Sequence, residues 1–233
     1  MFKKLRIVLE AIKFEHTVFA LPFALTGAVL ADGFPPLRTL GWILLAMVGA
    51  RSAAMAFNRI VDLRYDRLNP RTRSRALATG ALRVAEMWVL VLVAVAVFLY
   101  AAYRLNPLAF ALSPVALLVV LGYSYTKRFT SLSHLVLGLA LGIAPTAAWI
   151  GVTGRIDLAP VALSGAVLFW TAGFDIIYAL QDLEFDRKLG LFSVPAKVGP
   201  AKALAMSRAF HALTVLLLAW FGLLLGLGAF YWA

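Results

Sequence analysis

Residues 58–66, NRIVDLRYD, place three polar side chains at the end of a long apolar run. Asn58, Asp62 and Asp66 are spaced four residues apart. An α-helix turns by about 100° per residue, so a step of four drifts by only about 40° and the three side chains share one face. We therefore predict a helix that ends in a polar stripe.

A second acidic stretch, DIIYALQDLEFD at 175–186, repeats this pattern far along the chain. Asp175, Tyr178, Asp182 and Asp186 stand at offsets of three, seven and eleven, which also return to one face of a helix. More than half of the 11 acidic residues fall in the two stretches. Two helices with carboxylate stripes at their ends predict a shared divalent-metal site.

The composition is that of an integral membrane protein. Of the 233 residues 63% are hydrophobic, with a mean hydropathy of +0.89, whereas soluble domains are about 45–50% apolar. The chain has no cysteine, which excludes disulfides and zinc–thiolate sites. We attribute the net charge of +11 to membrane topology and contact with anionic lipid, and expect no nucleic-acid partner.

Seven apolar runs approach the length of about 20 residues that spans a bilayer. They cover 15–31, 39–57, 85–103, 107–123, 134–151, 160–181 and 204–227. We therefore expect an all-α transmembrane helical bundle around a central cavity, as a single domain over 1–233. The basic segment before the first run is interrupted by acidic residues, so we interpret it as a retained amphipathic segment and not as a signal peptide.

The basic residues orient these spans. Most of the 22 Lys and Arg residues lie in the N-terminal segment and in the connections 58–84, 124–133 and 182–208. The other side of the membrane carries only Arg38, Arg104 and Arg155. The positive-inside rule then predicts a cytoplasmic N-terminus and both acidic stretches at the cytoplasmic face of the cell inner (plasma) membrane.

The residue types around the acidic stretches favour magnesium and a diphosphate. Mg²⁺ prefers oxygen ligands and is commonly held by one or two carboxylates plus substrate phosphates. The candidate oxygen ligands are Asn58, Asp62, Asp66, Asp175, Asp182 and Asp186. The candidate diphosphate-binding cations are Arg71, Arg75, Lys127 and Arg128. A diphosphate neutralised by metal and cations is a good leaving group, and an allylic cation formed by its loss suits an aromatic face such as Tyr123, Tyr178 or Phe174.

Simpler interpretations apply to several of these residues. A single aspartate at the end of a span is more often an interfacial anchor than a ligand, although two regular stripes on one side favour a site. His134 and His211 are expected to be interfacial or packing groups. A transporter is the alternative of another class, but transporters usually carry their polar groups near the membrane midplane.

The motifs resemble those of the UbiA superfamily of intramembrane prenyltransferases. The family's N-x-x-x-D-x-x-x-D motif matches 58–66, and its D-x-x-Y-x-x-x-D-x-x-x-D motif matches 175–186. The family loop R-T-x-x-R-P-L-x-x-G is found at 71–80 with Ala76 in place of proline, and a Y-x-x-x-K-R segment is found at 123–128. The resemblance runs from about residue 15 to residue 227.

This resemblance implies nine spans around a central cavity, so we expect the family's last two spans to be absent from this chain. It also implies two magnesium ions, a polyprenyl diphosphate donor, ionisation of that donor, and electrophilic attack on an aromatic ring. Asp62, Asp66, Asp182 and Asp186 would then be the catalytic carboxylates.

Arg51 bears on the acceptor. It lies seven residues before Asn58, about two helical turns deeper on the same face. An arginine inside a span is usually functional or paired with an acid. In the 4-hydroxybenzoate branch of the family an arginine here contacts the acceptor's carboxylate, so the chain is most similar to bacterial 4-hydroxybenzoate polyprenyltransferases of quinone biosynthesis. Dihydroxynaphthoate, homogentisate, haem or a glycerol phosphate lipid remain alternative acceptors, and prenyl chain length and oligomeric state have no signature in the sequence.

Overall fold

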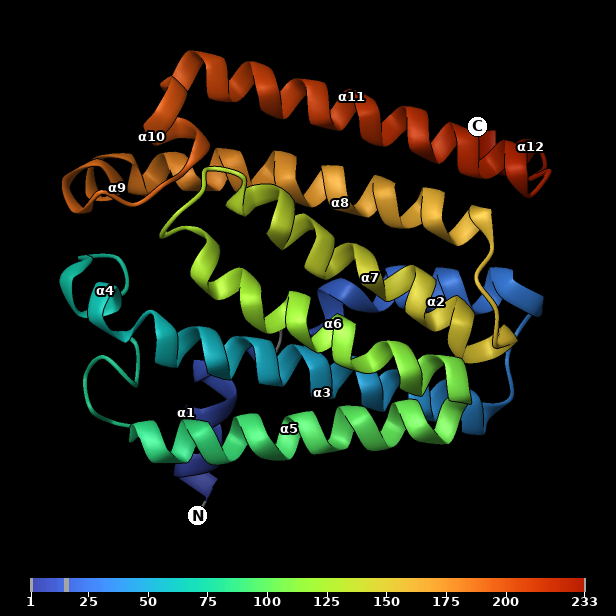
Figure 1. Ribbon diagram of the computed structural model, residues 1–233, viewed down its shortest axis with the longest axis horizontal. Coiled ribbons are helices and arrows are strands. Elements are labelled where there is room, and N and C mark those ends of the chain that lie inside the picture. The colour runs from blue at the N-terminus through green and yellow to red at the C-terminus, as the bar shows by residue number, and fades with distance from the viewer. Residues whose placement is uncertain (1, 15–16, 233) are drawn as a thin grey trace. The chain divides into compact units, whose positions relative to one another are not determined.

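The structure, a computed structural model, describes residues 2–14 and 17–232. Every regular element in this described part is helical, as the sequence predicts (Figure 1). The helices are α1 Phe2–Ala11, α2 Thr17–Asp32, α3 Leu37–Val61, α4 Leu63–Leu68, α5 Val84–Leu105, α6 Pro107–Thr126, α7 Ser133–Thr153, α8 Leu158–Ala179, α9 Leu183–Leu189, α10 Val194–Val198, α11 Pro200–Leu224 and α12 Ala229–Trp232. A 3₁₀ turn, Leu180–Asp182, joins α8 to α9.

The chain divides into two compact units. The first contains residues 1–22 and 36–124, and the second contains 23–35 and 125–233. The two acidic stretches therefore belong to different units.

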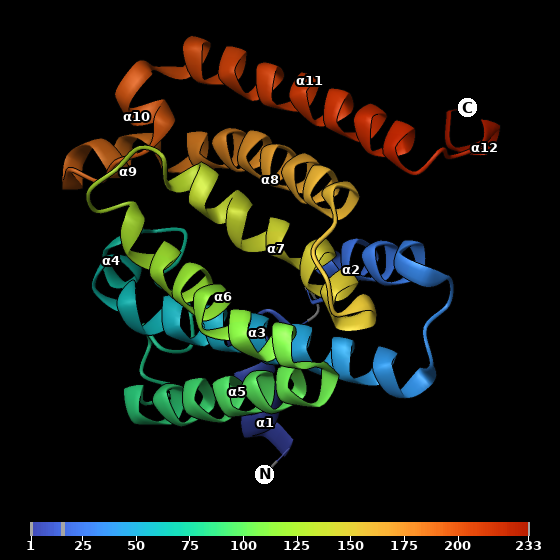
Figure 2. The same ribbon diagram turned by 45° about the vertical axis from the view of Figure 1, so that its right-hand side comes forward.

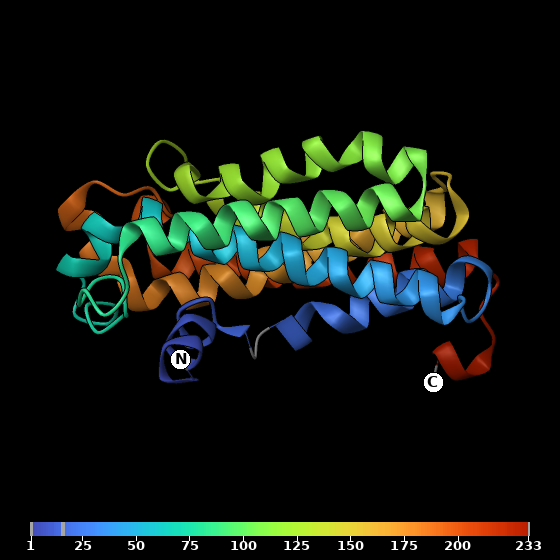
Figure 3. The ribbon, with the colours of Figure 1, turned by 90° about the horizontal axis from the view of Figure 1, so that it is seen from below.

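The first unit is built on α3 and α5, which run side by side (Figures 1 and 3). Gly49 of α3 permits this close approach, because a Cβ there would lie 2.9 Å from the backbone oxygen of Ala94. At the end of α3 that carries the first acidic stretch, a buried apolar cluster joins α1, α3, α5 and the loop 69–83. Its buried members are Ile12, Ala56, Leu77, Leu82, Met87 and Val91.

The second unit is built on α8, which packs against α7 on one side and α11 on the other (Figure 2). A Cβ at Gly138 or Gly142 would lie 2.3 or 2.7 Å from the backbone oxygen of Leu168 or Ser164. Small residues at such helix contacts let the backbones approach closely, which is the usual way that helices associate within a membrane. The α7–α8 pair is thereby held in one register.

Six of the seven predicted runs are confirmed as helices of spanning length. In the described part of the chain these are Leu37–Val61, Val84–Leu105, Pro107–Thr126, Ser133–Thr153, Leu158–Leu189 and Pro200–Leu224. The first run, 15–31, differs: its helix α2 has 16 residues, which rise only about 24 Å against a hydrocarbon core of about 30 Å, and residues 15 and 16 lie outside the described part. The protein is a multi-pass membrane protein.

The glycine contact between α7 and α8 generates a stability prediction. Gly138→Ala should destabilise the protein by about 1–3 kcal/mol, because the new methyl group overpacks the contact with α8. The measurement is the midpoint of thermal unfolding in detergent. Gly41→Ala in α3 is the matched control, since a Cβ there meets no heavy atom within 4 Å and alanine favours a helix. Equal losses in the two variants would contradict the close-packing explanation.

Candidate active site

The first acidic stretch bends at its middle aspartate. Helix α3 ends at Val61, Asp62 takes φ −88° and ψ 2°, and α4 begins at Leu63. The hydrogen bonds nevertheless keep helical spacing, because the Asp62 amide donates to the Asn58 carbonyl and the Asp66 amide to the Asp62 carbonyl, at 2.9 and 2.8 Å. The predicted single helix is therefore interrupted, while the four-residue backbone repeat that underlies the stripe is preserved.

Asn58 bonds directly to the next member of the stripe. Its Nδ2 donates to Asp62 Oδ2 at 2.9 Å and lies 3.5 Å from Ser124 Oγ of α6. Its Oδ1 accepts a longer bond, 3.4 Å, from a terminal nitrogen of Arg59. The amide of Asn58 thus supports the carboxylate of Asp62 from one side.

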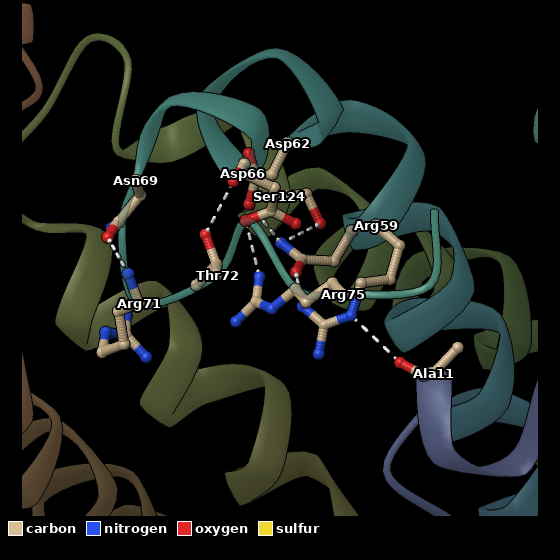
Figure 4. A network of polar contacts seen from close by, with 10 residues as sticks. Ala11, Arg59, Asp62, Asp66, Asn69, Arg71, Thr72, Arg75 and Ser124 are labelled. Atoms are coloured by element: carbon tan, nitrogen blue, oxygen red, sulfur yellow. Dashed lines mark hydrogen bonds and ion pairs between the residues drawn. The ribbon is translucent and has the colours of Figure 1, made fainter. Parts of the chain in front are cut away.

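Asp66 is buried and paired with a cation (Figure 4). A terminal nitrogen of Arg75 donates to Asp66 Oδ1 at 2.7 Å. The loop that carries Arg75 is fixed by further contacts: the Thr72 hydroxyl donates to the Asp66 carbonyl at 3.3 Å, and the Arg71 amide donates to Asn69 Oδ1 at 2.9 Å. The stretch 69–75 therefore folds back over the acidic helix end.

Arg59 is a site residue that the sequence did not single out, since it counts there only as one more topological charge. Its side chain is buried, and its Nε donates to the carbonyl of Ala11 in α1 at 3.0 Å (Figure 4). Together with the bond to Asn58, this connects α1 to the acidic stretch through hydrogen bonds. Its place directly after Asn58 was the feature of the sequence that could have indicated a role in the site.

The second acidic stretch also changes helical form. Helix α8 ends at Ala179, the 3₁₀ turn carries Asp182, and α9 carries Asp186. Asp182 is largely buried at 7% exposed, and Asp186 is completely buried. These carboxylates are thus held inside the unit and do not face solvent.

Asp186 is paired with the lysine of the predicted Lys-Arg segment. Lys127 Nζ lies 2.8 Å from Asp186 Oδ1, but neither carboxylate oxygen has a partner with hydrogen-bond geometry in the described part of the chain. The contact is an ion pair, because attraction between opposite charges depends on their separation and much less on the angle between the groups. The Lys127 carbonyl accepts from the Phe192 amide at 2.7 Å, which ties the loop after α6 to the loop after α9.

Asp175 is held by a histidine. Asp175 Oδ2 lies 2.6 Å from His134 Nδ1 at the start of α7, and His134 Nε2 accepts from the Val194 amide at 3.2 Å. The sequence had suggested only an interfacial or packing role for His134. The structure instead gives both ring nitrogens a polar partner.

The other predicted site residues lie on α3, α6 and α8 or in the loops that follow α4 and α6. Arg128 stacks on Tyr125 with its guanidinium carbon 5.1 Å from the ring centre. Tyr178 on α8 is half exposed, and Arg71 is exposed. Arg51 lies in α3 and Tyr123 near the end of α6, both partly buried. Within the units, the structure brings together Asn58, Asp62, Asp66 and Arg75 in the first and pairs Asp186 with Lys127 in the second.

Comparison with known proteins decides the family. The model of the "UbiA prenyltransferase family" matches residues 20–233. The chain belongs to this family. A 4-hydroxybenzoate solanesyltransferase of Synechocystis sp. is 35% identical to this UbiA family member over 215 residues, which cover 92% of this chain and 73% of the relative.

Solved structures agree with the assignment of this UbiA family member. A UbiA homolog from Aeropyrum pernix K1, solved without ligand, has a TM-score of 0.87 and 42% identity, and the match covers 93% of this chain and 82% of that one. A UbiA homolog from Archaeoglobus fulgidus, solved bound to DMAPP and Mg²⁺, has a TM-score of 0.77 and 26% identity, covering 93% and 78%. The predicted resemblance and helical fold are confirmed.

The donor set of this family member fits magnesium. Its candidate ligands are carboxylate oxygens, which Mg²⁺ prefers, and it has no thiolates that would select a softer metal. No cluster of three or more His, Cys, Asp or Glu side chains forms a ready-made cage among the residues that the structure describes. Mg²⁺ is commonly held by one or two carboxylates with substrate phosphates completing its octahedron.

The buried Asp66–Arg75 pair generates a second prediction. Arg75→Gln should lower the free energy of unfolding by about 1–3 kcal/mol, because a buried carboxylate loses its counter-charge. The exposed pair of Arg6 with Glu10, at 2.7 Å, is the control, and Arg6→Gln should lower stability much less, because water screens an exposed ion pair.

A second substitution isolates the cause. Asp66→Asn in the Arg75→Gln background should restore part of the lost stability, because the neutral amide needs no counter-charge. Thermal unfolding in detergent measures all four proteins. The explanation is wrong if Asp66→Asn lowers stability further in that background.

Proposed function

We propose that this protein transfers a polyprenyl chain from a polyprenyl diphosphate to 4-hydroxybenzoate in quinone biosynthesis, with Mg²⁺ as cofactor. Two buried aspartates at helix ends, Asp66 and Asp186, each paired with a basic residue from a loop, carry the proposal. Family membership and the name of the Synechocystis relative support it. Both units serve one reaction in this proposal, as a single catalytic domain.

In this proposal the acidic residues bind Mg²⁺ and the basic residues bind the diphosphate. Asp62 and Asp66 in the first unit, and Asp182 and Asp186 in the second, are the proposed Mg²⁺ ligands, with Asn58 and Asp175 beside them. Bound Mg²⁺ would neutralise charge on the diphosphate and so improve it as a leaving group. The proposed diphosphate-binding residues are Arg71, Arg75, Lys127 and Arg128.

Arg75 and Lys127 suit this role because each already faces a carboxylate. Their contacts with Asp66 and Asp186 are 2.7 and 2.8 Å. Both lysine and arginine bind phosphates, arginine with a planar fork and lysine as a point charge. A cation that stands beside a metal-binding carboxylate also stands where a metal-bound diphosphate would lie.

The bond changes follow from the substrates. The C1–O bond of the prenyl diphosphate breaks, and its electron pair leaves with the diphosphate. The allylic cation is attacked by an electron-rich ring carbon of 4-hydroxybenzoate, a new C–C bond forms, and the ring loses one proton to recover its aromaticity. Tyr123 and Tyr178 are proposed to shield the cation with their aromatic faces.

The location follows from the distribution of basic residues. The N-terminal segment and the loops next to both acidic stretches carry most of the Lys and Arg, so the positive-inside rule places them at the cytoplasmic face. We propose that the protein resides in the cell inner (plasma) membrane, and that its diphosphate-binding residues face the cytoplasm. A donor with an apolar tail would then reach them from the bilayer.

Product analysis tests the proposed function. Purified protein with Mg²⁺, a polyprenyl diphosphate and labelled 4-hydroxybenzoate should give an apolar labelled product whose mass equals the acceptor plus the prenyl group less one hydrogen. Asp66→Asn and Asp186→Asn should each lower the rate by at least about 100-fold, since loss of one charge-stabilising contact costs that much. Glu184→Gln, in the same stretch but exposed, is the control. Full activity in the aspartate variants would refute the metal role.

Arg51 is proposed to bind the carboxylate of the acceptor. Replacing it with methionine removes the charge but keeps much of the apolar stem. Arg51→Met should raise the KM for 4-hydroxybenzoate by about 10-fold or more, the value of one charged hydrogen bond, and should leave the KM for the donor unchanged. Phenol, which lacks the carboxylate, should be used equally by the parent and the variant. Equal changes in both KM values would show that Arg51 does not contact the acceptor.

A further inference from the structure

His134 is a buried polar side chain that the proposed reaction does not use. It is only 3% exposed and is the second residue of α7. Its ring stands between Asp175 on α8 and the first residue of α10, Val194, and it contacts both. One imidazole therefore joins three helices of the second unit.

The contacts fix the tautomer of this imidazole. A backbone amide can only donate, so Nε2 must accept from Val194 through its lone pair. The ring proton then resides on Nδ1, which donates to Asp175 Oδ2 at 2.6 Å. With both nitrogens occupied in this way, the imidazole is neutral and its orientation is fixed.

A neutral donor differs from the partners of the buried Asp66 and Asp186. Arg75 and Lys127 bring a full positive charge to Asp66 and Asp186. His134 orients Asp175 through a hydrogen bond but, as a neutral group, brings no positive charge to it. Because a carboxylate is planar, holding one oxygen also sets the direction of the other. Asp175 is thereby presented as a pre-oriented anion, which is what a cation ligand requires.

The same histidine connects Asp175 to the loop that follows α9. This loop, residues 190–193, bonds through the Leu191 amide to the Asp186 carbonyl and through the Phe192 amide to the Lys127 carbonyl. The loop leads into α10 at Val194, whose backbone amide donates a hydrogen bond to His134 Nε2. The hydrogen bonds therefore make Asp175, Asp186 and Lys127 parts of one connected framework.

We propose that His134 is a positioning residue for Mg²⁺–diphosphate binding, acting through Asp175. The inference rests on the proposed function, because it takes Asp175 as part of the metal-binding group. Partners that orient a ligating residue are typically worth about 10- to 100-fold in metal affinity. A purely structural histidine would change stability and leave the metal requirement unaltered.

Two amide substitutions separate the two hydrogen bonds. The amide group of asparagine can replace Nδ1, so His134→Asn keeps a donor for Asp175 and loses the acceptor for Val194. The longer glutamine replaces Nε2, so His134→Gln keeps the acceptor for Val194 and loses the donor for Asp175. The readout is the Mg²⁺ concentration that gives half of the maximal thermal stabilisation in the presence of inorganic pyrophosphate, with no prenyl or aromatic substrate.

His134→Gln should raise this Mg²⁺ concentration by about 10-fold or more, whereas His134→Asn should leave it close to the parent value. The midpoints of thermal unfolding measured without Mg²⁺ show how much each substitution destabilises the fold itself. His211→Asn is the matched control: His211 packs against Gly173 of α8 and is bonded to Ser207, at 3.5 Å. It should change the midpoint without changing the Mg²⁺ requirement.

A double-mutant cycle tests whether His134 acts through Asp175. In the Asp175→Asn background, His134→Gln should add nothing to the Mg²⁺ requirement, because the residue it orients has already lost its charge. A full additional shift in that background would overturn the proposal. So would equal Mg²⁺ requirements in the parent and His134→Gln, or a parent that Mg²⁺ and pyrophosphate do not stabilise.

The outcome is distinguishable from failure of the proposed function. Absence of a prenylated 4-hydroxybenzoate product would refute the proposed acceptor but would not alter the pyrophosphate measurement. Normal product formation with an unchanged Mg²⁺ requirement in His134→Gln would refute only the role of His134.

Discussion

The structure depends on how carboxylates are satisfied away from water. A buried charge is costly unless it has a partner, and several aspartates at helix ends are buried here. Asp66 is met by Arg75 from the loop after α4, and Asp186 by Lys127 from the loop after α6. These demands fold the polar loops back onto the helix ends. Under the proposed function, the same groups that pair with the aspartates would also bind the diphosphate.

The helices that carry these groups are held by close packing of small residues. Within a membrane the hydrophobic effect does not drive helices together, so contact between backbones becomes important. Gly138 and Gly142 bring α7 against α8, and Gly49 brings α3 against α5. The α7–α8 contact in turn fixes the distance between His134 and Asp175. Asp175 is thus positioned by packing contacts that lie about one and two helical turns along α7 from His134.

The aspartates of the two stretches receive different kinds of partner. Cations meet Asp66 and Asp186, whereas an amide supports Asp62 and a neutral imidazole supports Asp175. A cation neutralises a carboxylate and can later bind a phosphate. A neutral donor orients the carboxylate without adding a charge to it. Under the proposed function, this division would give each stretch both an anion for Mg²⁺ and a cation for the diphosphate.

The sequence alone determined the helical class, most of the spans and the two acidic stretches, because apolar length and four-residue spacing are local properties of the chain. It also identified the family, through motifs such as 58–66. Only the tertiary structure decided the bend at Asp62 and the partners of the buried groups. Arg59 bonds to a carbonyl 48 positions away, and His134 to groups 41 and 60 positions away. Such pairs depend on which helices pack together and at what depth, and no local periodicity encodes that.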